Sequence, residues 1–146
     1  MRLVIEFEWR DLGGVQLESN GSLRFPTLPA EPGIYRFSIS EAARTAVYIG
    51  EADNLRRRMQ NYRSPGTSQP TNRRLNDELK RVLASGGAVE VSVMTAARLE
   101  MDADEALVNL RHKAYRVLVE HAALVPAIHR GTDTVINLAK ESGTNV

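Results

Sequence analysis

The sequence has no cysteine, which excludes a disulfide framework, a thiolate metal site and a cysteine nucleophile. Its apolar runs all fall short of the ~20 residues that a membrane-spanning helix needs. Residues 1–8 carry acidic side chains and lack the apolar core of a signal peptide. The histidines are not spaced as zinc ligands, and there is no glycine-rich loop of the nucleotide-binding kind. From these absences we expect a cytoplasmic protein that does not enter a membrane.

The composition that remains is typical of one globular domain, with 42% hydrophobic and 25% charged residues in a chain of 146. The net charge is only +1, but the basic residues are concentrated. Residues 54–81 contain eight Lys or Arg and two Asp or Glu, a local charge of +6, so the rest of the chain carries −5. Such a patch favours docking of a polyanion on one face, although ordinary solvated helix faces would give the same composition.

One stretch, residues 33–62, organises the rest of the chain. It begins with Gly33-Ile34-Tyr35 and continues after a spacer with Tyr48-Ile49-Gly50. β-prone residues around both tripeptides predict two strands of a hairpin, whose link near residues 40–43 has room for a helical turn. Gly33 and Gly50 lie at strand ends, where the backbone needs freedom or close approach.

A helix is expected directly after this hairpin, with Asp53 as its N-cap and an end at Pro65. Its apolar positions recur at helical spacing: Leu55, Met59 and Tyr62. The same helix brings Arg58 and Tyr62 one turn apart. This places a permanent cation beside a phenol at the end of the hairpin.

Residues 1–31 are expected to form an N-terminal extension of unknown role. Leu3 to Phe7 read as a strand, and residues 11–31 as turns and loops with one short strand at 15–17 or 23–25. After the first helix, a second one should start at a cap on Thr71 or Asn72 and stop at the Gly86-Gly87 pair. Alternating valines then predict a strand over residues 88–94.

The last predicted element before the C-terminus is a long helix from Asp102, which forms a capping box with Glu105, to Pro126. Its apolar stripe is Leu107, Leu110, Ala114, Val117, Leu118, His121 and Leu124, with His121 at the edge of the core. A short strand is expected at residues 135–136 and a frayed tail at 141–146. The order of elements predicts an α+β fold, a small antiparallel or mixed sheet flanked by helices.

The two tripeptides, their hairpin spacer and the following Asn54-Leu55-x-x-Arg58 resemble the GIY-YIG nucleases, a family of excision-repair, homing and restriction endonucleases. Glu120 and Asn137 resemble that family's metal-binding glutamate and its C-terminal asparagine. The resemblance covers roughly residues 32–140, which we take as the nuclease-like domain. It implies a metal-dependent enzyme that hydrolyses phosphodiester bonds, with DNA as its partner.

The resemblance makes Glu120 the ligand of a divalent metal, Mg²⁺ or else Mn²⁺. A single hard carboxylate suits Mg²⁺, which keeps most of its waters and shares ligands with phosphate. On a helical wheel Glu120 lies at the border of the apolar stripe that runs from Val117 to Leu124. The structural alternative is a surface ion pair with Arg116, four residues earlier.

Arg58 takes the role of the phosphate clamp in the resemblance, because a guanidinium offers a charged bidentate fork to phosphate oxygens. The neighbouring arginines would bind the nucleic-acid backbone: Arg56, Arg57, Arg63, Arg73 and Arg74. A solvated arginine with no such role is the alternative for each of them.

The resemblance assigns proton transfer to Tyr35 or Tyr48, and we favour Tyr48. A phenol has an unperturbed pKa of about 10, so a cation or a metal-bound water would have to assist it. Tyr62 would bind a phosphate oxygen or orient the base, while Gly33, Gly50 and Asn137 would support the site. The alternative for each tyrosine is a core position with a hydrogen-bonded hydroxyl.

Glu51 departs from the family pattern, since many relatives carry a basic or small polar residue there. A carboxylate so near the scissile phosphate would repel it unless it binds metal or turns away. Two other functions therefore stay open: a catalytically weak or inactive nucleic-acid-binding module, and a subunit whose basic patch meets an acidic partner. High sequence specificity would need a homodimer or a partner protein.

Overall fold

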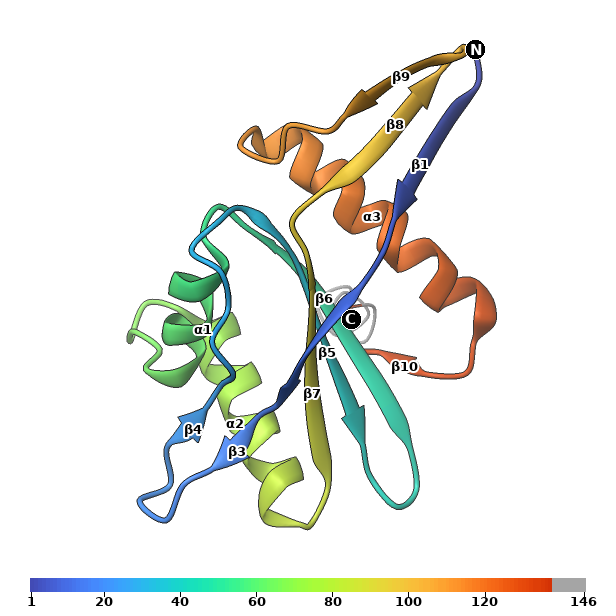
Figure 1. The fold of residues 1–146 in the computed structure, drawn as a ribbon. Helices are drawn as coiled ribbons and strands as arrows, with labels where there is room; N and C mark the ends of the chain where they lie inside the picture. The colour runs from blue at the N-terminus through green and yellow to red at the C-terminus, as the bar shows by residue number, and fades with distance from the viewer. Residues whose placement is uncertain (138–146) are drawn as a thin grey trace.

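The centre of the fold is a five-stranded sheet, seen in the computed structural model of the chain, which describes residues 1–137 (Figure 1). Its strands, in spatial order, are β10 (Thr134–Val135), β6 (Thr45–Ala52), β5 (Gly33–Ser40), β7 (Ala88–Met94) and β2 (Arg10–Gly14). Neighbours are antiparallel except β10 and β6, which are parallel. The predicted α+β class with a mixed sheet is confirmed.

Strands β5 and β6 form the hairpin expected from the two tripeptides. Tyr35 is paired with Gly50, and Phe37 with Tyr48. Because directly opposed residues point to the same face of an antiparallel pair, Tyr35 and Tyr48 share one face of the sheet. The link has no helical turn, although residues 40–43 left room for one, and it is closed by a backbone hydrogen bond from the N–H of Glu41 to the carbonyl of Arg44.

Two helices, α1 (Leu55–Arg63) and α2 (Pro70–Ala84), pack on the sheet face that carries Tyr35 (Figure 1). The predicted N-caps of both helices are wrong. In α1 the side chain of Asn54, not of Asp53, accepts the backbone N–H of Arg57 at 3.0 Å. In α2 the N-cap is Gln69 and Pro70 opens the helix, where its missing N–H costs nothing.

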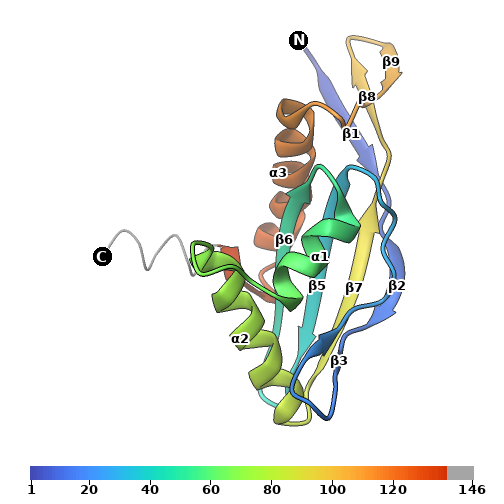
Figure 2. The same ribbon diagram turned by 90° about the vertical axis from the view of Figure 1, so that its left-hand side faces the viewer.

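A second sheet extends the molecule at the end where the N-terminus lies (Figures 1 and 2). It contains β1 (Leu3–Phe7), β8 (Ala97–Met101) and β9 (Asp104–Leu107) in that spatial order. The helix start predicted at Asp102 is therefore wrong. Asp102 and Ala103 have φ values of 49° and 75°, as a two-residue hairpin turn requires, and the Asp102 carboxylate accepts the N–H of Arg2.

Helix α3 (Lys113–Arg130) covers part of the other face of the five-stranded sheet. Its buried line is Arg116, Val119 and Ala123, which meets Ile34, Ile49 and Met94. The predicted stripe is thus wrong by about half a turn, and the His121 side chain is 69% exposed rather than at the core edge. The helix also continues past Pro126 and ends at Gly131, whose φ of 65° suits glycine.

The N-terminal segment is more ordered than the loops expected from its sequence. Residues 10–14 are the edge strand β2, and both candidate short strands form, as β3 (Gln16–Leu17) and β4 (Leu23–Arg24). Buried Val15, Leu23 and Leu28 join the core under α1 and α2. Within residues 1–137 no helix is long and apolar enough to cross a membrane. The tail predicted to fray, 141–146, lies outside the described residues.

Candidate active site

Three tyrosines from three elements meet beneath α1. The hydroxyls of Tyr35 on β5 and Tyr62 on α1 lie 2.5 Å apart. The ring of Tyr48 on β6 is 6.3 Å from that of Tyr35, centroid to centroid. Tyr35 and Tyr62 are only 2% and 1% exposed, whereas Tyr48 is half-buried. Tyr48 is therefore the phenol of the three that an external substrate can reach most readily.

The electrostatic surroundings keep all three phenols protonated. Burial raises the pKa of Tyr35 well above its usual value and also raises that of Tyr62. For Tyr48 burial raises the pKa and the charge of Glu120 adds to it, while hydrogen bonding to Tyr62 opposes it. The three side chains are thus neutral hydrogen-bonding groups at physiological pH, and none is a ready phenolate base.

Both glycines of the tripeptides allow close approach at this site. A Cβ on Gly50 would overlap the hydroxyl of Tyr35 on the neighbouring strand. A Cβ on Gly33 would lie 2.5 Å from the carbonyl oxygen of Met94 and 2.8 Å from the Leu55 side chain. The small residues therefore let Tyr35 and α1 pack directly on the hairpin.

Arg58 projects from α1 toward the same cluster. It is half-buried and donates a hydrogen bond of 3.2 Å to the backbone carbonyl of Glu51. Its charge interacts with all three tyrosines. The guanidinium keeps further N–H donors, as a phosphate clamp would need.

Glu120 approaches the cluster from α3, on the opposite side of β6. Its side chain is 19% exposed, and its carboxylate lies 3.6 Å from the imidazole of His121. Burial raises the pKa of Glu120, and the negative charge of Glu51 raises it further. Three interactions lower it: the charge of His121, a hydrogen bond from the backbone of Glu51, and the charge of Arg58. Together with its electrostatic contact to Tyr48, this places Glu120 at the edge of the tyrosine cluster.

The donor set fits one weakly coordinated hard cation. A half-buried carboxylate with a raised pKa gains from a nearby cation, which favours its charged form. Within residues 1–137 no group of three or more His, Asp or Glu side chains could hold a metal together. A metal at Glu120 would therefore take its remaining ligands from water and substrate, as Mg²⁺ commonly does.

Glu51 is held by Arg116, a residue that sequence analysis considered only as a surface partner of Glu120. The Arg116 guanidinium lies 2.6 Å from the Glu51 carboxylate, and the side chains are 8% and 15% exposed. Arg116 also donates to the carbonyls of Leu110 and Arg111, at 3.1 and 3.0 Å. The charge of Glu51 is thus compensated inside the protein, so this carboxylate should repel a bound phosphate less than its sequence position suggested. The helical spacing of Arg116 with Val119 and Ala123 was the available signal.

Asn137 acts on the backbone next to Tyr48. Its side-chain oxygen accepts the N–H of Ile49 at 3.1 Å, and its amide donates to the carbonyl of the same residue at 2.8 Å. The two bonds imitate a neighbouring strand and fix β6 between Tyr48 and Gly50.

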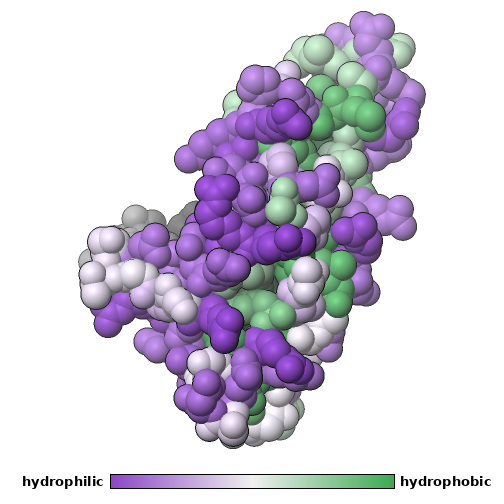
Figure 3. All heavy atoms as spheres, turned by 60° about the vertical axis from the view of Figure 1, so that its left-hand side comes forward, coloured by the Kyte–Doolittle hydropathy of each residue, from purple (hydrophilic) through white to green (hydrophobic). Residues whose placement is uncertain are grey.

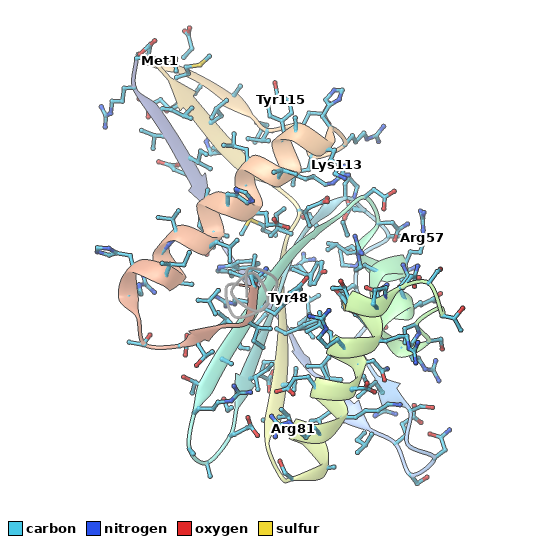
Figure 4. The ribbon with its side chains drawn as sticks, turned by 180° about the vertical axis from the view of Figure 1, so that it is seen from behind. Met1, Tyr48, Arg57, Arg81, Lys113 and Tyr115 are labelled. Carbon is cyan, nitrogen blue, oxygen red and sulfur yellow. The ribbon has the colours of Figure 1, made fainter. Side chains whose placement is uncertain are left out.

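The basic segment 54–81 does not form one surface. Arg56 and Arg63 lie on the flank of α1 away from Arg58, in a groove beside the N-terminal segment. Arg74 lines a separate groove of about 500 Å³ together with Tyr48 and Thr71. Arg57 and Arg73 are exposed, and Figure 4 shows Arg57 far from Arg81 across the helical layer.

Two further cations of this region are neutralised within the protein. Arg44 and Arg81 share the carboxylates of Glu41 and Glu78, at N···O distances of 2.7 to 3.0 Å. They contribute little to an outward positive field. Arg74, one of the predicted DNA-binding arginines, lines the same groove as Tyr48.

Comparison with known proteins agrees with this geometry. Residues 31–102 match the UvrC-like GIY-YIG domain. The UvrABC system protein C of Legionella pneumophila, strains Lens and Paris, is 29% identical over 118 residues, which are 81% of this chain and 18% of that protein. The protein of the same name from Chlorobaculum tepidum is 47% identical over 47 residues, 32% of this chain and 7% of that one. The chain thus spans less than a fifth of these relatives.

Among solved structures, a mutant of bacteriophage T4 EndoII aligns with 68% of this chain and 77% of its own, at 22% identity and a TM-score of 0.48. The paired tripeptides lie on adjacent strands, Arg58 follows on the next helix, and the family domain matches residues 31–102. Residues 31–102 of this chain therefore form a GIY-YIG domain.

Proposed function

We propose that this chain is an endonuclease that hydrolyses DNA phosphodiester bonds with the help of a divalent metal. The observation that carries the proposal is the meeting of Tyr48, Arg58 and Glu120, which come from β6, α1 and α3. These three supply a phenol with solvent access, a fixed cation and a carboxylate. Phosphodiester cleavage needs groups of these kinds to position the phosphate, offset its charge and move protons.

Each residue has a distinct role in this proposal. Glu120 holds Mg²⁺ or Mn²⁺, which when bound supplies positive charge and lowers the pKa of a coordinated water. Arg58 binds a nonbridging phosphate oxygen, and its bond to the Glu51 carbonyl fixes its direction. Tyr48, the most exposed of the three phenols, orients the attacking water, and because it is neutral it accepts the proton of that water only as it passes its own hydroxyl proton to solvent.

Tyr35 and Tyr62 position rather than react in this scheme. Their hydroxyls are bound to each other and are almost fully buried. They hold the ring of Tyr48 and the helix that carries Arg58. Asn137 supports the same strand from the other side.

DNA is the proposed partner, and the proposal places the activity in the cytoplasm. The relatives named UvrABC system protein C belong, by that name, to a system of several proteins. We therefore propose that a second copy of the chain or a partner protein supplies the choice of target. A non-catalytic DNA-binding module is the second candidate, favoured by the raised pKa values of all three phenols.

The direct test is nicking of supercoiled plasmid with Mg²⁺ or Mn²⁺, with metal-free buffer as the blank. The proposal expects nicks that depend on metal and disappear in the Glu120→Gln variant. DNA binding without any metal-dependent nicking, on plasmid and on branched or nicked DNA alike, would support the non-catalytic module instead.

A further inference from the structure

A second basic site lies on the flank of α1 that faces away from the tyrosine cluster. There a groove of about 220 Å³ separates α1 from the end of β4 and the residues that follow it. Three arginines from these two elements line it: Arg24, Arg56 and Arg63. Among the lining residues that the structure describes, none is acidic. Figure 3 shows this side of the molecule as a largely hydrophilic surface.

The three guanidinium groups keep donors for a ligand. Arg56 donates its Nε–H to the carbonyl of Leu28 at 2.9 Å, and Arg24 donates one N–H to the side-chain oxygen of Gln16 at 2.5 Å. A guanidinium has five N–H donors, so most remain. The acidic group that the structure places near them is Glu18, 4.0 Å from Arg63, which is the limit of an ion pair. The groove is therefore electropositive, in contrast to the neutralised pair of Arg44 and Arg81.

The walls of the groove are fixed by the core. Arg24 follows Leu23, which is fully buried, and Phe25 packs on Phe37 with ring centroids 6.1 Å apart. On the other wall, Met59 of α1 is buried between Arg56 and Arg63. The arginine backbones are thus held in place before any ligand arrives, which reduces the ordering cost of binding.

We propose that this groove binds a backbone phosphate of the DNA, as a second contact separate from the one at Arg58. Arginine forks match phosphate oxygens in a bidentate manner, and three of them around one groove suit a phosphodiester. At 3.6 residues per turn, Arg56 lies roughly 160° from Arg58 around the axis of α1. The DNA would therefore lie across α1, with one phosphate on each flank of a helix about 10–12 Å wide.

This inference rests on the proposed function, because the ligand is the same DNA. It gives the N-terminal segment a role, since Arg24 comes from that segment and not from the matched family domain at residues 31–102. The other class of partner for such a groove is an acidic protein segment. The presence of Arg58 and Tyr48 on the opposite flank of the same helix favours DNA.

The test is the salt dependence of binding to a labelled DNA duplex in EDTA, where no cleavage occurs. The slope of log K against log salt should flatten by about 0.9 in the double variant Arg24→Gln/Arg63→Gln and by less in Arg24→Gln, since one phosphate contact contributes about 0.9. Arg56 is left in place because it also holds the Leu28 carbonyl. The control Arg2→Gln/Arg130→Gln removes the same charge from exposed ends of β1 and α3 and should keep the wild-type slope.

Several outcomes would overturn the inference. An unchanged slope in the double variant, or equal flattening in the control, would show that these arginines make no specific phosphate contact. Loss of binding to a polyglutamate peptide with unchanged DNA binding would assign the groove to an acidic protein. Because the assay needs no cleavage, a wild-type protein that binds as expected but never nicks plasmid would defeat only the catalytic proposal. Equal melting temperatures would verify that the variants fold.

Discussion

The guanidinium of Arg116 lies 2.6 Å from the carboxylate of Glu51, and this largely buried pair ties α3 to the end of β6. The backbone of Glu51 also contacts both flanks of the site, because its carbonyl accepts Arg58 and its backbone hydrogen-bonds Glu120. One residue, placed directly after Gly50, thus joins the proposed phosphate clamp to the proposed metal ligand. The pair is a framework on which the two charged groups of the site are placed.

Removing one member of this pair should destabilise the protein strongly. Arg116→Met leaves the Glu51 carboxylate buried and unpaired, a change that costs about 3–5 kcal/mol for buried pairs. The double variant Glu51→Met/Arg116→Met should recover much of this loss, because both charges are gone. Urea unfolding of the wild type, both single variants and the double variant measures the coupling. Additive losses would show that the two side chains do not stabilise each other.

Glu51→Lys introduces the basic residue that the family resemblance leads us to expect, yet here it should be harmful. It would place a second cation against Arg116, which is only 8% exposed. We expect a lower melting temperature and weaker cleavage, measured side by side on the same preparation. Glu51→Lys/Arg116→Glu, which reverses the pair, is the control and should regain stability. Faster cleavage by Glu51→Lys with normal melting would mean that Glu51 instead hinders phosphate binding.

Glu120→Gln should abolish metal-dependent cleavage while leaving the fold intact. The change keeps the shape of the side chain and removes its charge, so the rate should fall by orders of magnitude. DNA affinity should stay level or rise, since a negative charge leaves the site. Mg²⁺ should raise the melting temperature of the wild type and not of the variant. Cleavage at the wild-type rate would show that another carboxylate, not Glu120, binds the metal.

The stability of the protein should depend on pH through the ionisation of Glu120. The folded protein raises the pKa of Glu120, mainly through burial, so ionisation of this group opposes folding. The cost is absent below the unfolded pKa of about 4.3 and develops as the pH rises through the folded pKa. Without metal, Glu120→Gln should therefore melt above the wild type at pH 7, with the difference shrinking toward pH 4. A constant difference across this range would contradict the assignment.

Phenylalanine substitutions separate the reacting phenol from the structural ones. Tyr48→Phe should change stability by about 1 kcal/mol or less, yet slow cleavage about 10²–10⁴-fold if the hydroxyl moves a proton. Tyr35→Phe removes the 2.5 Å hydrogen bond of the buried Tyr62 hydroxyl, which keeps its bond to Tyr48, and should cost about 0.5–1.5 kcal/mol without slowing cleavage comparably. Single-turnover rates and melting curves of both variants distinguish a phenol that takes part in cleavage from one that only stabilises the fold. Normal cleavage by Tyr48→Phe would show that Tyr35 or solvent, not Tyr48, transfers the proton.

The sequence by itself determined the parts of the protein that depend on short-range patterns. The hairpin of Tyr35 and Tyr48, the helix that brings Arg58 beside Tyr62 and the strand 88–94 were all predicted from alternation, helical spacing and turn residues. Each of these signals lies within one or two elements. The predicted metal ligand and its supporting asparagine came from the family resemblance, and the structure brings both to the same strand, β6.

Only the tertiary structure decided the features that depend on distant partners. Residues 97–107 form strands because β8 finds β1 across the chain, with Asp102 holding Arg2 at a separation of 100 residues. Glu51 is compensated by Arg116, 65 residues away, and the +6 segment is split between one groove beside α1 and another beside α2. Local periodicity contains no information about such pairing. Burial and long-range contacts therefore fixed which charges are free and which phenol is accessible.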